Sequence, residues 1–396
     1  MTSEGNLLVG QSGGPTPVIN SSLAGVISEA QKQSKIGTIF GMEQGIEGLL
    51  HGKIKEIPKM TEKNIERLAF TPASALGSCR YKLKDEDYFK LLKIFRQNNI
   101  RYFFYIGGND SMDTCNKIAK FSEAESYEMY AIGIPKTVDN DLPYTDHCPG
   151  FGSAGRFIAI STICSGRDLE SMKTFDNVVI SEIMGRNTGW LAASSALLKR
   201  DLRDAPHLIY LPERTFFVDK FLEDVKKVYV KLGYVFVAIG EGIKDENGDF
   251  IGAKNLAKDC FGHVAIALSE GPAAYLARTV IKELGLQARY NRSGTIQRSY
   301  SESTSNIDRK EAFLSGEKAV KLAVNGETGK MITLVREGGY EFKCKTGISL
   351  LEEVANIEKI VPSEFINKEG NFITDAFIEY ALPLIGSGVY EFFRFK

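Results

Sequence analysis

The feature that most constrains the fold of this chain is a recurring unit of an apolar run, a glycine-rich or polar loop, and a stretch with helical periodicity. Residues 102–106 show it clearly, because this apolar run ends in the loop 107–111 and a helical pattern follows. Near-continuous apolar runs are typical of strands that are buried on both faces of a parallel sheet. The pattern therefore predicts an α/β protein whose doubly wound sheets have right-handed crossovers.

The same unit recurs over most of the sequence. We expect strands at residues 6–9, 38–42, 102–106, 129–134, 177–183, 208–211 and 234–239, and an edge strand within 287–293. Helices are expected at 62–69, 85–98, 151–168, 189–198, 218–231 and 262–284, the last interrupted at Gly271 and Pro272. Because 396 residues exceed one simple core, we expect lobes at 1–150 and 151–325 and a C-terminal extension at 326–396 packed on them.

Composition excludes several classes of protein. The chain has 49 basic and 50 acidic residues, a balance that argues against nucleic-acid binding. No apolar run is long enough to span a membrane, and residues 1–5 lack the features of a signal peptide, so we expect a cytoplasmic protein with no membrane partner. The six cysteines and four histidines show no spacing typical of a disulfide framework or a zinc site.

Three loops in the first lobe follow predicted strands, where an open α/β sheet usually binds its ligands. The first, residues 10–17, contains Gly13 and Gly14 and precedes a helix. Glycines let the backbone approach a phosphate, and a helix N-terminus adds N–H donors. The spacing is not that of a Walker loop. A plain tight turn between strand and helix is the alternative interpretation.

The second loop, residues 107–111, has the same construction and adds side-chain oxygens. Gly108 and Ser111 flank Asn109 and Asp110, whose oxygens are ligands that Mg²⁺ accepts beside a phosphate. The alternative is that Asn109 and Asp110 cap the following helix.

The third loop, residues 135–141, combines Lys136 and Thr137 with the carboxylates Asp139 and Asp141. A carboxylate beside a cation at a strand end suits a general base, a metal ligand or a phosphate clamp. The alternative is a solvated turn, for which Pro135 and Asn140 are typical residues.

The second lobe offers different side chains at its strand ends. Residues 184–186, Met-Gly-Arg, end one strand, Glu241 ends another, and Arg289 and Arg298 bracket a polar loop. Arginine holds phosphate through bidentate bonds, and glutamate accepts hydrogen bonds from sugar hydroxyls. A sugar phosphate would satisfy both. Arg80 is a further candidate phosphate ligand.

These motifs together resemble the 6-phosphofructokinases in order and spacing, over most of residues 6–325. The resemblance rests on residues 13–20, 107–111, 135–141, 184–186 and 296–298. It implies two α/β lobes with the active site between them, and phosphoryl transfer to the 1-hydroxyl of fructose 6-phosphate to give fructose 1,6-bisphosphate, a reaction of glycolysis. It also implies Mg²⁺ as cofactor and a homodimer or homotetramer.

The resemblance assigns roles residue by residue. Asp139 resembles the general base, with Lys136, Thr137, Asp110 and Asp141 around the reacting centre. Five positions match contacts to the phosphoryl donor: Gly13, Gly14, Arg80, Gly108 and Ser111. Contacts to the sugar phosphate are matched by Thr137, Asp139, Asp141, Met184, Gly185, Arg186, Glu241, Arg289, Thr295, Gln297 and Arg298. Among these, Arg289 matches an arginine that reaches into a neighbouring subunit's site in bacterial relatives.

Two departures from the family pattern concern the donor. Family members that use ATP have glycines at the positions of Asp110 and Lys136, where the α-phosphate needs room. Here Asp110 would crowd and repel that phosphate, whereas Lys136 could neutralise charge on a leaving phosphate. The resemblance therefore implies a pyrophosphate donor and a reversible reaction, with an ATP-dependent enzyme as the alternative.

Two further departures concern the metal and the sugar phosphate. Asn109 replaces the usual metal-binding aspartate, so that Mg²⁺ would depend more on Asp110. Asn177 stands where a second bridging arginine is expected. An NAD kinase or lipid kinase would not explain residues 184–186 or 296–298. A non-catalytic sugar-phosphate sensor would have no need of Asp139.

Overall fold

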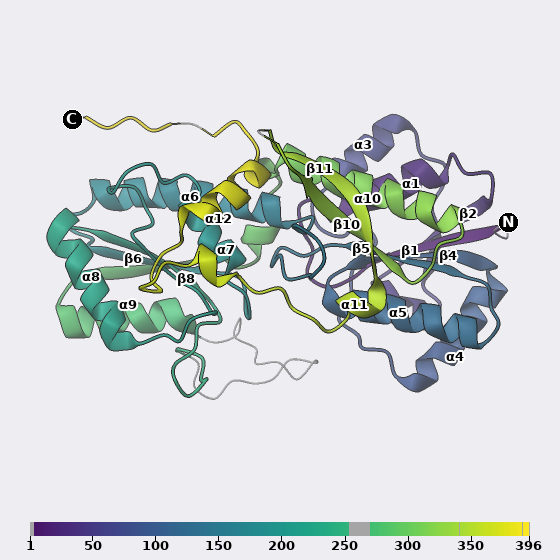
Figure 1. Cartoon of the computed structure of the whole chain (residues 1–396), viewed down its shortest axis with the longest axis horizontal. Coiled ribbons are helices and arrows are strands. Elements are labelled where there is room, and N and C mark those ends of the chain that lie inside the picture. Colours follow the sequence, from purple (N-terminus) through teal and green to yellow (C-terminus); the bar gives the residue numbers. More distant parts are fainter. Residues whose placement is uncertain (1–3, 253–269, 340, 390, 396) are drawn as a thin grey trace. The chain divides into compact units, whose positions relative to one another are not determined.

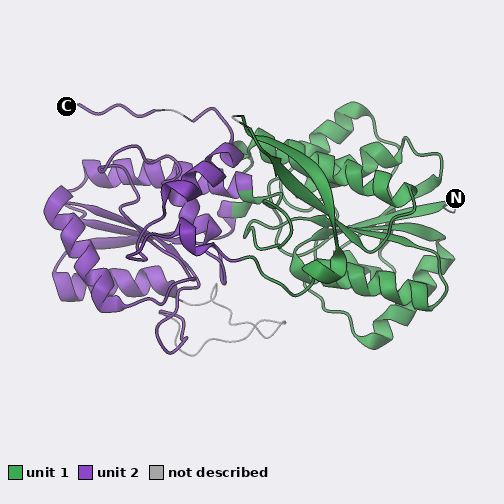
Figure 2. Ribbon diagram, in the orientation of Figure 1, with its two compact units in different colours: residues 1–151, 260–263, 298–359 green, residues 152–259, 264–297, 360–396 purple. Residues whose placement is uncertain are grey.

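The computed structural model describes residues 4–252, 270–339, 341–389 and 391–395. These residues form two compact units, coloured separately in Figure 2. Unit 1 contains the described residues of 4–151 and 298–359, and unit 2 those of 152–297 and 360–395. The boundary expected at residue 150 lies beside this division. The stretch expected as a C-terminal extension is divided, because residues up to 359 belong to unit 1 and later ones to unit 2.

Unit 1 is built on a seven-stranded sheet with the order β11-β10-β5-β4-β1-β2-β3. The strands from β10 to β2 are parallel, and β11 and β3 are antiparallel edge strands. The strand bounds are β1 (Gly5–Gln11), β2 (Ile36–Met42), β3 (Ile54–Glu56), β4 (Ile100–Gly107), β5 (Tyr130–Pro135), β10 (Lys330–Glu337) and β11 (Lys343–Leu350).

Both faces of this sheet carry a hydrophobic core. Alternate residues of β4 point to opposite faces, so Phe103 and Tyr105 enter one core while Tyr102 and Phe104 enter the other. Helices α1 (Ile19–Ala30) and α10 (Asn306–Val324) cover one face, and α4 (Asp85–Gln97) and α5 (Asn109–Ala124) cover the other (Figure 1). The remaining helices of unit 1 are α2 (Gly45–Leu50), α3 (Glu62–Phe70), α11 (Leu351–Val354) and the 3₁₀ turn η4 (Ser301–Ser303).

Unit 2 has a four-stranded parallel sheet with the order β7-β8-β6-β9. Its strands are β6 (Val178–Ile183), β7 (Leu208–Tyr210), β8 (Val235–Gly240) and β9 (Ala288–Arg292), the last at an edge as expected. Its helices are α6 (Phe151–Ser171), α7 (Trp190–Ala193), α8 (Val218–Leu232), α9 (Gly271–Leu284), α12 (Asp375–Ala381) and the 3₁₀ helices η1 (Ser194–Ala196), η3 (Gly294–Arg298), η5 (Ser363–Phe365) and η6 (Leu382–Ile385).

Two expectations for helices need adjustment. Residues 262–269 of the expected helix 262–284 lie outside the described residues, and α9 begins at Gly271, with Pro272 near its start where a missing N–H costs nothing. The expected helix 189–198 is a short α-helix, α7, continued by η1. None of the helices in the described part of the chain has the length and hydropathy that a membrane crossing requires.

The alternation of parallel strands and helices places the polar loops at the carboxyl ends of the strands in each sheet. In unit 1 the loops after β1, β4 and β5 lie at the carboxyl ends of three neighbouring strands. In unit 2 the loops after β6 and β8 are likewise neighbours. The doubly wound α/β architecture expected from the sequence is confirmed.

Candidate active site

The three loops of unit 1 that the sequence singled out are held against one another. The Lys136 N–H donates to the Gly107 carbonyl at 2.9 Å, which joins the loop after β5 to the loop after β4. The Ser12 N–H donates to the Ile106 carbonyl at 2.9 Å, which joins the loop after β1 to the end of β4. The predicted donor loops therefore form one continuous surface in unit 1.

The first loop requires glycine at Gly13 and brings an arginine close to Gly14. Gly13 has a φ of +73°, which side chains rarely adopt, and a Cβ there would lie 3.3 Å from Nζ of Lys136. A Cβ on Gly14 would lie 2.3 Å from Nη1 of Arg298. Two cations, Lys136 and Arg298, are therefore packed against the backbone of this glycine loop.

Lys136 is the most unusual of the predicted site residues. Its side chain is buried, with the residue 3% exposed, and Nζ donates to the Gly14 carbonyl at 2.7 Å. Burial and the charge of Arg298 lower the pKa of Lys136 to about 8, although Asp139 and Asp141 oppose the shift and Arg80 adds to it. A buried cation beside other cations is costly unless an anion joins it, so this position favours an anionic ligand.

The segment 136–141 is fixed by its own side chains. The Thr137 hydroxyl accepts from the Asp139 N–H at 3.1 Å, and the Thr137 N–H donates to the Pro149 carbonyl at 3.2 Å. Asn140 is fully buried in the left-handed conformation, and its Oδ1 accepts from the Cys148 N–H at 2.9 Å. The segment is thus not a solvated turn, and it presents a half-buried Asp139.

The Asp141 carboxylate has one buried oxygen that could accept a further bond. Burial raises the pKa of Asp141, and its hydrogen bond with Thr137 only partly offsets this rise. Its Oδ1 is buried and makes no hydrogen bond with the described residues. A buried carboxylate oxygen of this kind is the sort of ligand that a divalent cation takes.

The loop after β4 has a different arrangement from that expected. A Cβ on Gly107 would lie 2.0 Å from Oγ of the buried Ser111, so a glycine is needed there. Asp110 is exposed on the first turn of α5. The Asn109 amide is bound by other residues: its Oδ1 accepts from the Asn356 N–H at 2.6 Å, and its Nδ2 donates to the Ile357 carbonyl at 2.5 Å. Of the two predicted metal ligands, only Asp110 therefore presents its side-chain oxygens to solvent.

In unit 2 the residues after β6 and β8 converge. The Glu241 N–H donates to the Ile183 carbonyl at 2.9 Å, and the Gly185 N–H approaches Oε1 of Glu241 at 3.4 Å. Gly185 has a φ of +126°. Buried Gln297 accepts from the Met184 N–H at 3.0 Å, so its carbonyl oxygen supports the backbone of residues 184–186. Met184, Gly185, Arg186 and Glu241 therefore lie together, as the sequence suggested.

The other residues predicted to bind sugar phosphate occupy several places. Nη2 of Arg289 forms an ion pair with Asp176 at 2.7 Å in unit 2. Thr295 is exposed on η3. Arg298 lies against Gly14 in unit 1, as described above. Asn177 is used structurally, because its Oδ1 accepts from the Gln287 N–H at 3.0 Å.

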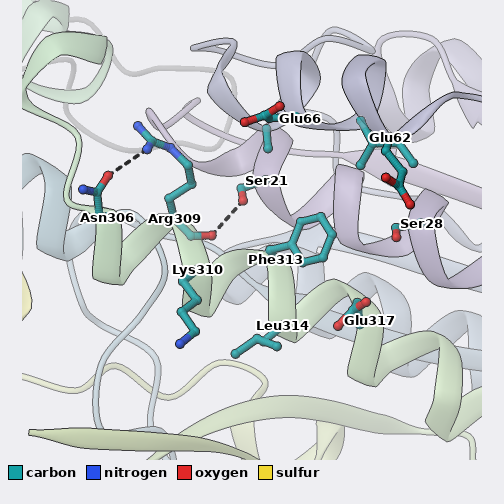
Figure 3. Close-up of a pocket in the computed structure, with 12 residues that line it drawn as sticks. Ser21, Ser28, Glu62, Glu66, Asn306, Arg309, Lys310, Phe313, Leu314 and Glu317 are labelled. Atoms are coloured by element: carbon teal, nitrogen blue, oxygen red, sulfur yellow. Dashed lines mark hydrogen bonds between the residues drawn. The ribbon is translucent and has the colours of Figure 1, made fainter.

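A cavity of about 590 Å³ lies elsewhere in unit 1, among helices α1, α3 and α10. Figure 3 shows Ser21 donating to the Arg309 carbonyl, at 2.7 Å, and Arg309 donating to Asn306, at 2.9 Å, beside Phe313. No residue that the sequence predicted for the site lines this cavity. Because its lining comes from helices and not from strand ends, we do not assign the active site to it.

Sequence reasoning missed several residues that position the site. Glu213 accepts from the N–H groups of Gly189 and Val361 at 2.8 and 3.0 Å. His147 and Lys359 hold the segment that follows Asp141, through contacts between residues more than 160 positions apart. None of these residues belongs to a local motif, so nothing in the sequence around them signals a role.

Comparison with known proteins gives a family and close relatives. The family model described as "Phosphofructokinase" matches residues 6–323. A protein of Rhodospirillum rubrum named "Pyrophosphate--fructose 6-phosphate 1-phosphotransferase" is 38% identical over 99% of this chain and 97% of its own length. A protein of Alkalicoccus urumqiensis named "Sulfofructose kinase" is 34% identical over 91% of each chain.

A solved structure is similar over almost the whole chain. The crystal structure titled as a pyrophosphate-dependent phosphofructokinase from Nitrosospira multiformis has a TM-score of 0.89 and 38% sequence identity. The similarity covers 99% of this chain and 94% of that one.

Proposed function

The chain belongs to the phosphofructokinase family, and from this premise we propose that it transfers a phosphoryl group from pyrophosphate to the 1-hydroxyl of fructose 6-phosphate. The products are fructose 1,6-bisphosphate and phosphate, in a reversible reaction of glycolysis. The observation that carries the choice of donor is Lys136, a buried lysine whose ammonium lies against the glycine loop at Gly14.

The donor site is the surface formed by the three loops of unit 1. Gly13, Gly14 and Gly108 present their backbone beside Lys136 and Arg298, where phosphoryl oxygens would bind, and Ser111 lies in the first turn of α5. Lys136 and Arg298 supply positive charge, with Arg80 near enough to lower the pKa of Lys136. Preorganised cations in a poorly hydrated site stabilise the leaving phosphate as charge develops on it.

Asp139 is the general base in this proposal. Its carboxylate removes the proton from the 1-hydroxyl, and the resulting oxygen attacks the phosphoryl group as the bond to the leaving phosphate breaks. The Thr137 hydroxyl holds the backbone of Asp139, and Asp141 adds a second carboxylate beside the reacting centre. In the reverse direction protonated Asp139 returns its proton to the sugar oxygen.

Enzymes of this family generally use a divalent metal ion. For this chain we propose Mg²⁺, with Asp110 and the buried Oδ1 of Asp141 as its protein ligands. When bound, the ion neutralises charge on the transferred phosphoryl group. Asn109 was expected as a ligand from its position, but its amide is bonded to the backbone of Asn356 and Ile357.

The sugar phosphate is assigned to the residues of unit 2 that gather at the ends of β6 and β8. Arg186 supplies a guanidinium for the 6-phosphate, and Glu241 accepts from sugar hydroxyls. Gln297 positions the backbone of Met184. Since one relative is named a sulfofructose kinase, sulfofructose is a second candidate sugar.

The test is a steady-state assay of the purified protein with each donor and each sugar. We expect turnover with pyrophosphate, Mg²⁺ and fructose 6-phosphate, and little with ATP. Robust ATP turnover without pyrophosphate activity would overturn the donor assignment. Faster turnover of sulfofructose than of fructose 6-phosphate would overturn the sugar assignment and leave the donor unaffected.

Enzymes of this family are generally oligomeric. We propose a homodimer or homotetramer in the cytoplasm, with Arg289 reaching a neighbouring subunit's site.

A further inference from the structure

We propose that residues Leu351 to Lys359, called here the strap, close the donor site beside α5 and restrict the donor to two phosphoryl groups. In this proposal Asn109 anchors the strap and does not bind metal. The inference rests on the proposed function, because it concerns how that site discriminates among donors. The strap lies beyond residues 6–323, the part of the chain that the family model matches.

The strap is rooted in the core of unit 1. Leu351 and Val354 on α11 are both fully buried, in the same core as Met112 of α5 and Met331 of β10. The Leu351 N–H donates to the Gly329 carbonyl at 2.9 Å. A root packed in this way holds the following residues against α5.

The middle of the strap crosses the first turn of α5. Asn109, the first residue of that helix, bonds to the strap backbone on both sides of one peptide unit, through the Asn356 N–H at 2.6 Å and the Ile357 carbonyl at 2.5 Å. Asn356 adopts the left-handed conformation, with a φ of +65°, and its Nδ2 approaches Asp113 at 3.4 Å. Asparagine tolerates this conformation better than most residues.

The far end of the strap reaches the catalytic segment. The Lys359 N–H donates to the Asp141 carbonyl at 2.7 Å. Nζ of Lys359 donates to the carbonyls of Thr145 and Asp146, at 3.1 and 2.9 Å. The strap therefore runs across the carboxyl ends of β4 and β5, the neighbouring strands whose loops carry Asp110 and Asp139.

This position determines what can bind beside a pyrophosphate. A third phosphate would naturally extend to the N-terminal turn of α5, because a helix N-terminus attracts anions. The Asn356 N–H and the Ile357 carbonyl of the strap are bonded to Asn109 in that turn, and the negative charge of Glu358 lies close enough to interact with Asp141. Rejecting a larger anion by crowding and like charge is an established route to specificity.

The strap also accounts for the residue at position 109. The amide of asparagine can accept from the Asn356 N–H and donate to the Ile357 carbonyl at the same time. An ionised aspartate would place a carboxylate oxygen against that carbonyl and leave it without a donor. The asparagine at position 109, where the family has a metal-binding aspartate, is therefore explained by its two hydrogen bonds to the strap.

The experiment compares Asn109→Ala and Asn356→Pro with the wild-type protein. The first removes both side-chain bonds to the strap, and the second removes the Asn356 N–H and is incompatible with its positive φ. Asn356 is exposed, so the second change spares the core. Glu352→Gln is the matched control, because it removes only the exposed ion pair between strap and Lys120.

The probes are pyrophosphate and tripolyphosphate, each measured as donor and by calorimetric binding. We expect both strap variants to bind tripolyphosphate about tenfold more tightly, or to use it about tenfold better relative to pyrophosphate, as removal of a charge- and shape-based restriction predicts. The KM for fructose 6-phosphate and the behaviour of Glu352→Gln should not change. Unaltered discrimination in both strap variants would overturn the proposal.

Two further outcomes distinguish the strap proposal from a metal-binding role of Asn109 and from failure of the proposed function. If Asn109→Ala raises the Mg²⁺ concentration needed for activity and leaves donor discrimination unchanged, Asn109 is a metal ligand and the strap proposal is wrong. If the wild-type protein does not use pyrophosphate, the proposed function fails. The calorimetric comparison of tripolyphosphate binding then still decides whether the strap excludes larger anions.

Discussion

Lys136 shows how one side chain can be suited to a ligand before the ligand binds. Its ammonium donates to the Gly14 carbonyl, which satisfies a hydrogen bond but supplies no full negative charge. Burial and Arg298 lower the pKa of Lys136 to about 8. Binding of an anionic donor would raise the pKa again, because an opposite charge favours the protonated form.

The first prediction at this scale concerns pH. Because the pKa of Lys136 in the unliganded protein is lowered from 10.5 to about 8, the ammonium loses its proton as pH rises through about 8. We expect kcat/KM for pyrophosphate to fall through that range, while kcat persists to higher pH because bound pyrophosphate keeps Lys136 protonated. Lys136→Arg should abolish this fall, since a guanidinium stays charged. A wild-type profile as flat as that of the variant would exclude Lys136 as the titrating group.

Residues of the site differed in how far sequence could predict their surroundings. Lys136, Thr137 and Asp139 stand in one short segment after a strand, so their proximity followed from the local pattern. Asn109 has an equally clear local pattern, but its side chain is bound by a partner 247 residues away in sequence. A local motif states which groups are available and does not reveal which distant backbone will engage them.

At the scale of elements, the segment after β5 is locked to α10 and to the β10–β11 hairpin through His147. Nδ1 of His147 lies 2.8 Å from Asp146, and Nε2 lies 2.8 Å from Glu311 on α10. Arg336 on β10 donates to both oxygens of Asp146 at 3.1 Å, and Cys344 on β11 lies close to Glu311. The network ties the chain just beyond Asp141 to two other elements of unit 1.

Stability should depend on pH through this network. Burial lowers the pKa of His147, but its hydrogen bonds to Asp146 and Glu311 outweigh burial and raise the pKa above 6.5. The contribution of His147 to stability is therefore complete below pH 6.5 and is lost as pH rises through its raised pKa. We expect His147→Gln to lower the free energy of unfolding by about 3 kcal/mol at low pH, because the buried Glu311 loses its cation, whereas Asp146 keeps its pair with Arg336.

The measurement is denaturant unfolding of wild type and variant at pH 6 and pH 9. The difference between the two proteins should be larger at pH 6. The exposed His51 offers a matched control, since His51→Gln should alter neither value by much. An equal loss of stability at both pH values would show that packing of the ring, and not its charge, is what His147 contributes.

The elements themselves were predicted with uneven success, for a physical reason. β4 and β5 are continuous apolar runs, so burial on both faces was visible within a few residues. The pairing of β10 with β5 was not foreseen, because it joins segments about two hundred residues apart. The sheet order and the strap therefore emerged only from the structure.

At the scale of the whole molecule, the chain passes repeatedly between its two units. Residues 298–359 return to unit 1, where they add α10, two strands and the strap to a sheet begun by the first 151 residues. Neither unit is formed by one continuous segment. A division into successive lobes along the sequence does not describe this arrangement, although the α/β class of both units was predicted.

Arg289 poses the remaining question at this scale, because its predicted role requires a second subunit. In the single chain its guanidinium pairs with the nearly buried Asp176, yet 57% of its side chain is exposed. A guanidinium that is positioned by one ion pair and remains more than half exposed can also reach a neighbouring molecule. Asp176→Asn would release it without removing it, and serves as the control for loss of the ion pair.

The last prediction follows from symmetry. Asp139→Asn should lower kcat by about 10² to 10⁴ fold, and Arg289→Ala should mainly weaken sugar-phosphate binding. If Arg289 acts in the neighbouring site of a dimer, mixed dimers of the two variants contain one site with both residues intact. Equal mixing makes half of the dimers mixed, so activity should return to about a quarter of wild type. If Arg289 acts within its own chain, every site in the mixture lacks one of the two residues. Activity would then stay at the level of the separate variants after subunit exchange, and the role in a neighbouring subunit would be wrong.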